Sequence, residues 1–226
     1  MAKFKHIIPL GFFCGTAREL ERFGFRSRSY PFDWQISHSF ASILYLLENG
    51  FPDFLNADAM SKEGDTNRYY NSITDIHFYH DFTPTGELAP QLPAVKAKYE
   101  RRIERLYNDM KEPTLFVRYC FDAEEEKFYE ENSSRIEAFV KKGNPENKIL
   151  FIRSSDTARL ENVEPWRIDA YIAQPRGSYS GSFVKTVPGL RKYLADSFEP
   201  GRLVILRNRI RFWWSLIKKR LPKLYL

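Results

Sequence analysis

Residues 5–24 read KHIIPLGFFCGTARELERFG, and this stretch decides the fold class. It begins with a mostly apolar run that Gly11 closes, which is typical of a buried strand. From Thr16 to Phe23 apolar residues recur every third position until Gly24, and this spacing predicts a helix. A strand, a glycine turn and a helix open an α/β unit, so the sequence predicts a layered α/β domain.

The same alternation returns later in the chain. Residues 114–119 and 148–153 are predicted to be buried strands, with a helix over 124–142 between them. Because helical crossovers join parallel strands, we expect a mostly parallel sheet. The predicted fold is a three-layer α/β domain, Rossmann-like or SGNH-like.

Weaker patterns complete the prediction. Apolar spacing predicts helices over 39–49, 95–110 and 190–194, and short strands over 170–173 and 203–206. Residues 52–94 are rich in Asp, Asn, Pro and Gly, and we expect a long irregular insertion over the carboxyl edge of the sheet. The sequence thus predicts one α/β domain over 1–206 and a separate tail over 207–226.

Positive charge is concentrated in that tail. The chain of 226 residues has 35 Lys and Arg, 29 Asp and Glu, and a formal net charge of +6. Residues 207–226 hold seven bases and no acid, so the body keeps 28 bases against 29 acids. A near-neutral body excludes a basic nucleic-acid-binding domain, and we expect no nucleic-acid partner.

The composition is that of a globular protein from a reducing compartment. Two cysteines do not make a disulfide scaffold, and we expect a cytoplasmic location. The run 7–14 follows two lysines and mimics a signal peptide, but Pro9 and Gly11 interrupt it and we expect mature protein. No apolar run reaches the roughly 18 residues of a spanning helix.

Cys14 is the first candidate for chemistry. It follows the predicted first strand and begins the predicted helix. Helix N-termini carry partial positive charge and free N–H groups, which favour thiolates and hold oxyanions. Open α/β sheets bind ligands at the carboxyl ends of their strands. The alternative for Cys14 is a packing role, which we expect of Cys120.

Four histidines could partner a thiolate, namely His6, His38, His77 and His80. If residues 76–82 are extended, alternation places His80 among apolar side chains, where it is either a satisfied core residue or a functional one. A Cys–His pair would supply a nucleophile and a general base. A carboxylate, Asp33 or Asp81, could then orient the imidazole.

Other polar residues are candidates for binding substrate. In residues 29–34, SYPFDW, Asp33 lies between apolar neighbours and is either a site residue or a helix cap. Ser29, Trp34 and Asp81 are predicted to contact substrate.

Arg118 and Arg153 end two predicted neighbouring strands. On parallel strands they could converge on an anionic substrate, although strand-terminal arginines are also ordinary solvent-facing residues. No C-x-x-C, clustered His/Cys, P-loop or G-x-G-x-x-G pattern occurs, so we expect no metal and no cofactor.

Residues 11–14 and 29–34, together with Phe25 and Arg26, resemble the bacterial family catalogued as papain-like cysteine peptidases, otherwise a domain of unknown function. The resemblance covers roughly residues 5–155, with further matches at 51–54, 78–82, 99–103 and 115–118. It implies a thiol enzyme with Cys14 as nucleophile and His80 as its base. Cys14 is also placed like the nucleophile of SGNH-type hydrolases, with sulfur for oxygen, although the late Asp-x-x-His of that family is missing.

The tail has the pattern of an interfacial membrane helix. At about 100° per residue its apolar residues share a stripe about 120° wide, comprising Ile210, Trp213, Trp214, Ile217, Leu221, Leu224 and Tyr225. Paired tryptophans and an absence of acids favour an anionic membrane surface. Docking of this stripe on the body, or nucleic-acid binding by the tail, are the alternatives.

The leading hypothesis is a Cys14/His80 hydrolase or transferase that acts on a peptide, ester or glycan at the cytoplasmic membrane face. The rival is a glycan-binding or sugar-transferring protein of surface-polysaccharide assembly, in which Cys14 only packs and Arg118 and Arg153 hold an anion. A non-catalytic scaffold that recruits partners through its tail is a third possibility.

Overall fold

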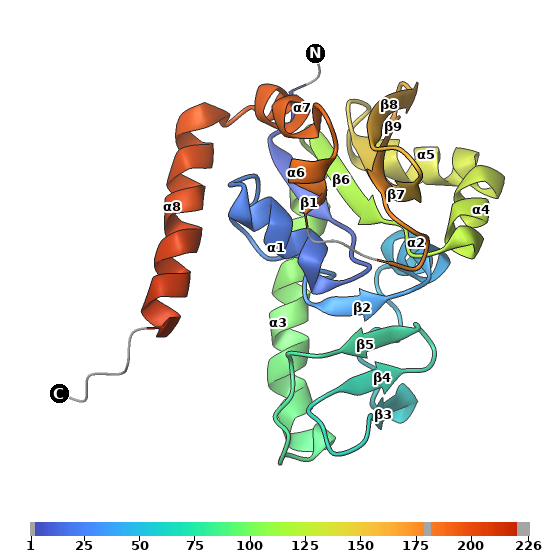
Figure 1. Ribbon diagram of the computed structural model, residues 1–226. Helices are drawn as coiled ribbons and strands as arrows, with labels where there is room; N and C mark the ends of the chain where they lie inside the picture. The colour runs from blue at the N-terminus through green and yellow to red at the C-terminus, as the bar shows by residue number, and fades with distance from the viewer. Residues whose placement is uncertain (1–2, 179–181, 221–226) are drawn as a thin grey trace.

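The computed structural model describes residues 3–178 and 182–220, and its centre is a five-stranded sheet in the order β1-β6-β7-β9-β8 (Figure 1). Four strands are parallel, namely β1 (His6–Pro9), β6 (Thr114–Tyr119), β7 (Lys148–Ser155) and β9 (Arg167–Ala173). The edge strand β8 (Arg159–Glu164) is antiparallel to β9. The predicted mostly parallel sheet is confirmed.

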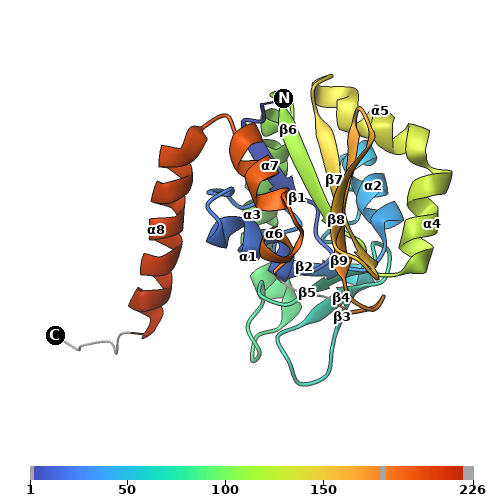
Figure 2. The ribbon, with the colours of Figure 1, turned by 45° about the horizontal axis from the view of Figure 1, so that its top comes forward.

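Helices cover both faces of this sheet (Figure 2). One face carries α2 (Phe40–Asn49), α3 (Leu88–Asp109), α4 (Ala123–Glu131) and α5 (Ser133–Gly143). The other carries α1 (Cys14–Arg22), α6 (Phe183–Thr186) and α7 (Leu190–Ser197). Each face of the sheet has its own hydrophobic core. In β6, Phe116 packs into the core on the side of α2 to α5, while Leu115 and Val117 pack into the core on the side of α1, α6 and α7, as the two-residue repeat of a buried strand requires. The three-layer fold is confirmed.

Two predicted helices differ most from the observed ones. The helix predicted over 124–142 is divided at Asn132, which ends α4 and precedes α5. The helix predicted from Val95 begins at Leu88 and contains Pro93. A proline within a helical pattern normally marks a boundary, which is why the sequence placed the start too late.

The insertion that was predicted to be irregular contains a second sheet. Its strands β3 (Met60–Lys62), β4 (Tyr69–Asn71) and β5 (Ile76–Phe78), with the short helix η1 (Ala57–Ala59), join β2 (Gln35–Ser37) in the antiparallel order β2-β5-β4-β3. Three-residue strands are too short to show an alternation in sequence. This small sheet lies beyond the carboxyl end of β6 (Figure 1).

Residues 203–206, predicted to be a strand, lie instead in the last helix, α8 (Gly201–Arg220). Four apolar residues in a row do not distinguish a strand from a helix. The helix packs outside α1 and α7 (Figures 1 and 2). Asn208 donates to the carbonyl of Gly24 at 3.1 Å, and a Cβ on Gly24 would lie 2.2 Å from the carbonyl oxygen of Ile205. Close backbone approach therefore requires glycine here.

The carboxyl group of Glu19 on α1 is buried, at 3% exposure. Burial raises its pKa to about 7, against the opposing effects of Arg22 and the backbone N–H of Val184. Between its ordinary pKa of 4.5 and about 7, the unfolded chain loses the Glu19 proton and the folded chain keeps it. The free energy of unfolding therefore falls as pH rises through this window.

Glu19→Gln should remove this loss. We expect the variant and the wild type to have similar stability at pH 4, and the variant to be about 2 to 3 kcal/mol more stable at pH 8. Urea unfolding at several pH values measures the difference. The exposed Glu104→Gln is the matched control. Parallel pH profiles for Glu19→Gln and the wild type would contradict the prediction.

Candidate active site

The loop between β1 and α1 holds two consecutive left-handed residues, Gly11 with φ 82° and Phe12 with φ 59°. This conformation is strained for a bulky side chain, and such strain clusters at functional sites. The backbone N–H of Ser37 donates to the carbonyl of Phe12 at 2.9 Å and ties the loop to β2. A Cβ on Gly11 would lie 2.8 Å from Ser37 Oγ, so the loop requires glycine.

Cys14 is the first residue of α1, as predicted, and is half-buried. Phe13 occupies the N-cap position and provides no side-chain acceptor for the first-turn N–H groups. Within the described residues the Cys14 thiol forms no hydrogen bond or ion pair. Cys120 is buried, and burial raises the pKa of its thiol well above the usual range, consistent with the predicted packing role.

His80 does not lie among the apolar side chains, and that part of the prediction was wrong. β5 ends at Phe78 and the chain bends, so the alternation stops before His80. The imidazole is exposed, and its ring meets the indole of Trp34 edge-on at 6.3 Å between centroids. No hydrogen bond or ion pair engages His80 among the described residues.

Asp33 is fully buried and belongs to the structural framework. It pairs with Arg26 and accepts the backbone N–H of Tyr30 at 2.8 Å. The guanidinium of Arg26 also lies 5.6 Å from the Trp34 ring and donates to Ser29 Oγ at 3.2 Å. No hydrogen bond or ion pair joins Asp33 to His80, and its carboxylate accepts from Arg26 and Tyr30 rather than from the first turn of a helix, so neither predicted role matches its partners.

Asp81 is likewise engaged away from His80. Its carboxylate pairs with Lys98 and accepts the hydroxyl of Tyr99 at 2.9 Å, both on α3. The side chain is 2% exposed. These contacts attach the end of the small sheet to α3, and within the described part of the chain no carboxylate is bonded to the imidazole of His80.

Arg118 is fully buried, and all five of its N–H groups have acceptors within the protein. Nε donates to Glu125 at 2.7 Å, and the terminal nitrogens donate to Ser37 and to the carbonyls of Leu10 and His38. Burial alone would lower the pKa of Arg118, but the carboxylate of Glu125 raises it. The predicted position at an open edge was wrong, because the small sheet covers the end of β6.

Arg153 points to the same face of the sheet as Arg118 and meets acids there. It contacts Glu126 and Glu130 of α4 and Asp169 of β9, at 3.3, 3.3 and 2.8 Å. Burial opposes its charge, but the acids Asp169 and Glu126 together raise the pKa of the guanidinium. Arg118 and Arg153 therefore each bind α4, and they do not converge on a free anion site.

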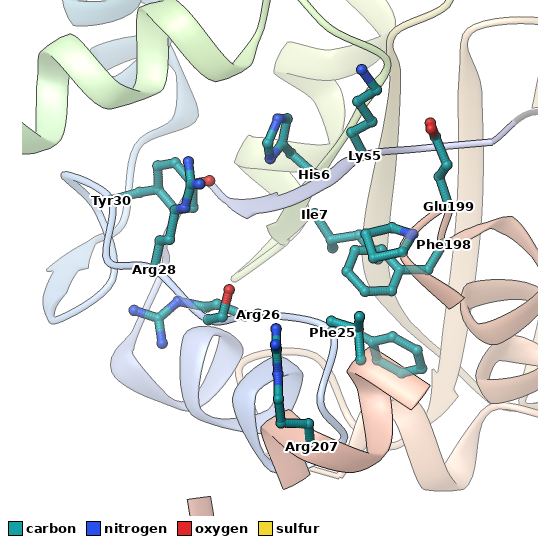
Figure 3. Close-up of a pocket in the computed structure, with 13 residues that line it drawn as sticks. Lys5, His6, Ile7, Phe25, Arg26, Arg28, Tyr30, Phe198, Glu199 and Arg207 are labelled. Atoms are coloured by element: carbon teal, nitrogen blue, oxygen red, sulfur yellow. The ribbon is translucent and has the colours of Figure 1, made fainter. Parts of the chain in front are cut away.

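A hollow of about 410 Å³ lies at the amino end of β1, and Figure 3 shows its basic lining. Arg207 of α8 contributes to it alongside residues of β1. Its other basic side chains are paired with acids: Lys5 and His6 contact Glu112, Arg28 contacts Asp109, and Arg26 contacts Glu21 and Asp33. Cys14 follows the carboxyl end of β1, so this hollow is not part of the thiol site.

Three side chains that the sequence did not predict to act together are neighbours in the structure. His38, Asp75 and His77 place one ligand atom each within 4.8 Å of one another. Burial lowers the pKa of His38, with Asp75 opposing and His77 adding to the effect. The ring of His38 also lies 5.8 Å from that of Phe12, two residues before Cys14. His38 is far in sequence from Asp75 and His77, and the pairing of β2 with β5 brings it to them.

These features define a three-layer α/β protein with a partly exposed thiol at the start of its first helix. The family model described as "Putative papain-like cysteine peptidase (DUF1796)" matches residues 5–132, more than half of the chain, and the chain belongs to that family. The match includes Cys14 and His80, whereas Arg153 and α8 lie outside it.

A curated relative is "Uncharacterized protein R408" of Acanthamoeba polyphaga mimivirus, which is 30% identical over 120 residues. The aligned part is 44% of this chain and 54% of the relative, so the chain spans about half the length of that protein. No solved structure matches the chain.

Proposed function

We propose that this protein is a cysteine-dependent hydrolase or transferase in which Cys14 is the nucleophile and His80 the general base. The strained turn that presents Cys14 at the start of α1 is the observation that carries the proposal. The bonding of the other candidate residues also supports the proposal. Asp33, Asp81, Arg118 and Arg153 are all bonded within the protein, whereas Cys14 and His80 have no hydrogen-bond partner among the described residues.

The proposed chemistry is acyl transfer. His80 accepts the thiol proton as Cys14 Sγ attacks an acyl carbon, and the first-turn N–H groups of α1 stabilise the oxyanion. The proton then passes to the leaving group, and water or another acceptor releases the acyl group. The rival glycan-binding hypothesis requires free guanidinium groups at residues 118 and 153, and both are engaged.

Alkylation by iodoacetamide at pH 7 tests the nucleophile, with Cys120 as an internal control. We expect modification at Cys14 at least tenfold faster than that of glutathione, and none at buried Cys120 in the folded chain. Cys14→Ser should abolish labelling and reduce p-nitrophenyl ester hydrolysis to the background rate. Slow labelling of Cys14 would contradict the proposal.

A pair of histidine variants tests the base. His80→Ala should slow the labelling of Cys14 about tenfold or more, whereas His38→Ala, at the other end of β2, should leave it unchanged. The reverse result would remove His80 from the mechanism and assign the base to His38.

We further propose that α8 holds the protein on the cytoplasmic face of an anionic membrane. Opposite the side that docks through Ile205, Asn208 and Phe212, the helix presents six large apolar side chains that are 46% to 83% exposed. They are Leu203, Leu206, Ile210, Trp213, Trp214 and Ile217. At 100° per residue this set spans roughly 100° of the helix surface, which is the shape of an interfacial helix.

Bases line both borders of this apolar face. Among the side chains that the structure describes on α8, the exposed bases are Arg202, Arg207, Arg211 and Lys218. The sequence of residues 201–220 contains no acid. Each base near an anionic leaflet contributes roughly 1 kcal/mol, and the cytoplasmic leaflet is the anionic one. If a second copy of α8 packed against this apolar face, these bases would lie next to the same bases of the other copy, and the like charges would repel. Among the described helices none has the length and hydropathy needed to cross a bilayer.

The alternative for the tail was that its apolar stripe docks on the body of the protein. The helix does dock on the body, but through a face other than the predicted stripe, so the stripe-docking alternative was wrong. Leu221, Leu224 and Tyr225 of the predicted stripe lie outside the described residues.

A further inference from the structure

The pairing of β2 with β5 gathers three metal-ligand side chains on one face of the small sheet. Ser37 is opposite Ile76 and Ile36 is opposite His77 in the antiparallel register. Continuing this register by one pair places His38 opposite Asp75. Alternation then puts His38, Asp75 and His77 on the same face, away from Ile76 and Phe78, which are buried in the core.

The neighbours of these three residues resemble an outer coordination shell. Glu63 Oε1 lies 3.0 Å from Nδ1 of His77, which leaves Nε2 of that ring for a ligand. The hydroxyl of Tyr70 donates to Asp75 Oδ1 at 3.2 Å. A carboxylate on the far nitrogen of a metal-binding histidine fixes the ring and strengthens it as a ligand. Asp75 itself has a left-handed backbone, with φ 52°, at the point where it enters the cluster.

The three donors are close but not bonded to one another. Their ligand atoms lie within 4.8 Å, and no hydrogen bond or ion pair joins any two of them in the described residues. Donors around one metal ion are separated in this way, because each is about 2 Å from the ion and on a different side of it. Two imidazoles and a carboxylate suit borderline metals such as Zn²⁺.

We propose that His38, Asp75 and His77 bind a divalent transition-metal ion, with Zn²⁺ as the best-fitting probe. Three protein ligands leave a fourth position open, which is the arrangement of a reactive rather than a closed structural site. His38 is exposed, so the ion can enter from solvent. This site is independent of the Cys14 and His80 proposal, because it uses neither residue.

Calorimetric titration of the full chain with ZnCl₂, after treatment with chelator, tests the proposal. We expect one equivalent to bind with micromolar affinity or better, and Co²⁺ in its place to give visible absorption typical of low coordination number. His38→Ala and His77→Ala should each weaken binding at least 100-fold. Glu63→Gln should weaken it 10- to 100-fold through the outer shell.

Two control variants test whether Zn²⁺ binds to another histidine or to Cys14 instead. His6→Gln removes a histidine at the amino end of β1, in the five-stranded sheet, and should leave Zn²⁺ affinity unchanged. Cys14→Ser should also bind normally, and loss of binding in that variant would overturn the donor set. Binding weaker than 100 µM, or equal binding by wild type and folded His38→Ala, would show an adventitious ion only and refute the site.

Discussion

Replacing Arg118 with methionine is expected to lower the free energy of unfolding by about 3 to 5 kcal/mol. The guanidinium holds the ends of β1 and β2 through Leu10 and Ser37 and pairs with Glu125 of α4. Removing it leaves the Glu125 carboxylate buried without its counterion. A substrate-binding arginine would instead be removed with little effect on stability, so urea unfolding distinguishes the two roles.

A second substitution separates the buried charge from the lost hydrogen bonds. Arg118→Met combined with Glu125→Gln leaves neither partner of this buried pair charged. The amide oxygen can still accept the N–H of Phe121, and the amide NH2 can donate to the hydroxyl oxygen of Tyr129. We expect the double variant to be more stable than Arg118→Met alone. The matched control is Arg135→Met, which breaks the exposed pair with Glu48 and should cost less than about 1 kcal/mol. Equal losses for Arg118→Met and the control would refute the structural role.

The layered fold could be predicted because its strands are long and buried on both sides. In residues 114–119 and 148–153, near-continuous apolar runs lead into or out of helical patterns, and this alternation determines a parallel sheet. The small sheet could not be predicted in this way. Its strands of three residues carry no periodic signal, and they are stable because β2 pairs with β5 and their apolar side chains pack on α3.

The location of Cys14 could also be predicted, since it depends only on a strand followed directly by a helix. The partners of polar residues could not. Arg118 is covered because β2 crosses the end of β6, and Asp33 is neutralised by Arg26, seven residues earlier. His80 is exposed because β5 ends two residues before it. The His38, Asp75 and His77 cluster depends on strand register, which sequence spacing alone does not reveal.

Removing the exposed apolar face of α8 should abolish membrane binding without unfolding the protein. In the combined variant Ile210→Ser, Trp214→Ser, Ile217→Ser, each side chain is about half exposed and makes no contribution to the docked face. If each inserts partly into lipid and contributes about 1 kcal/mol, the partition coefficient should fall about 100-fold. Sedimentation with vesicles that contain 30% phosphatidylglycerol measures this change, and the melting temperature should stay the same.

Controls separate the apolar face from surface hydrophobicity in general and from charge. Ile73→Ser changes a side chain of similar exposure, 55%, in the turn between β4 and β5, and should leave vesicle binding unchanged. Arg207→Gln with Arg211→Gln should weaken binding to anionic vesicles roughly 30-fold, and added salt should reduce the difference. Equal binding to neutral and anionic vesicles, or none at low salt, would contradict the membrane proposal. Dimerisation that the serine substitutions reverse would assign the same face to a second copy instead, because lipid and protein would then compete for one apolar surface.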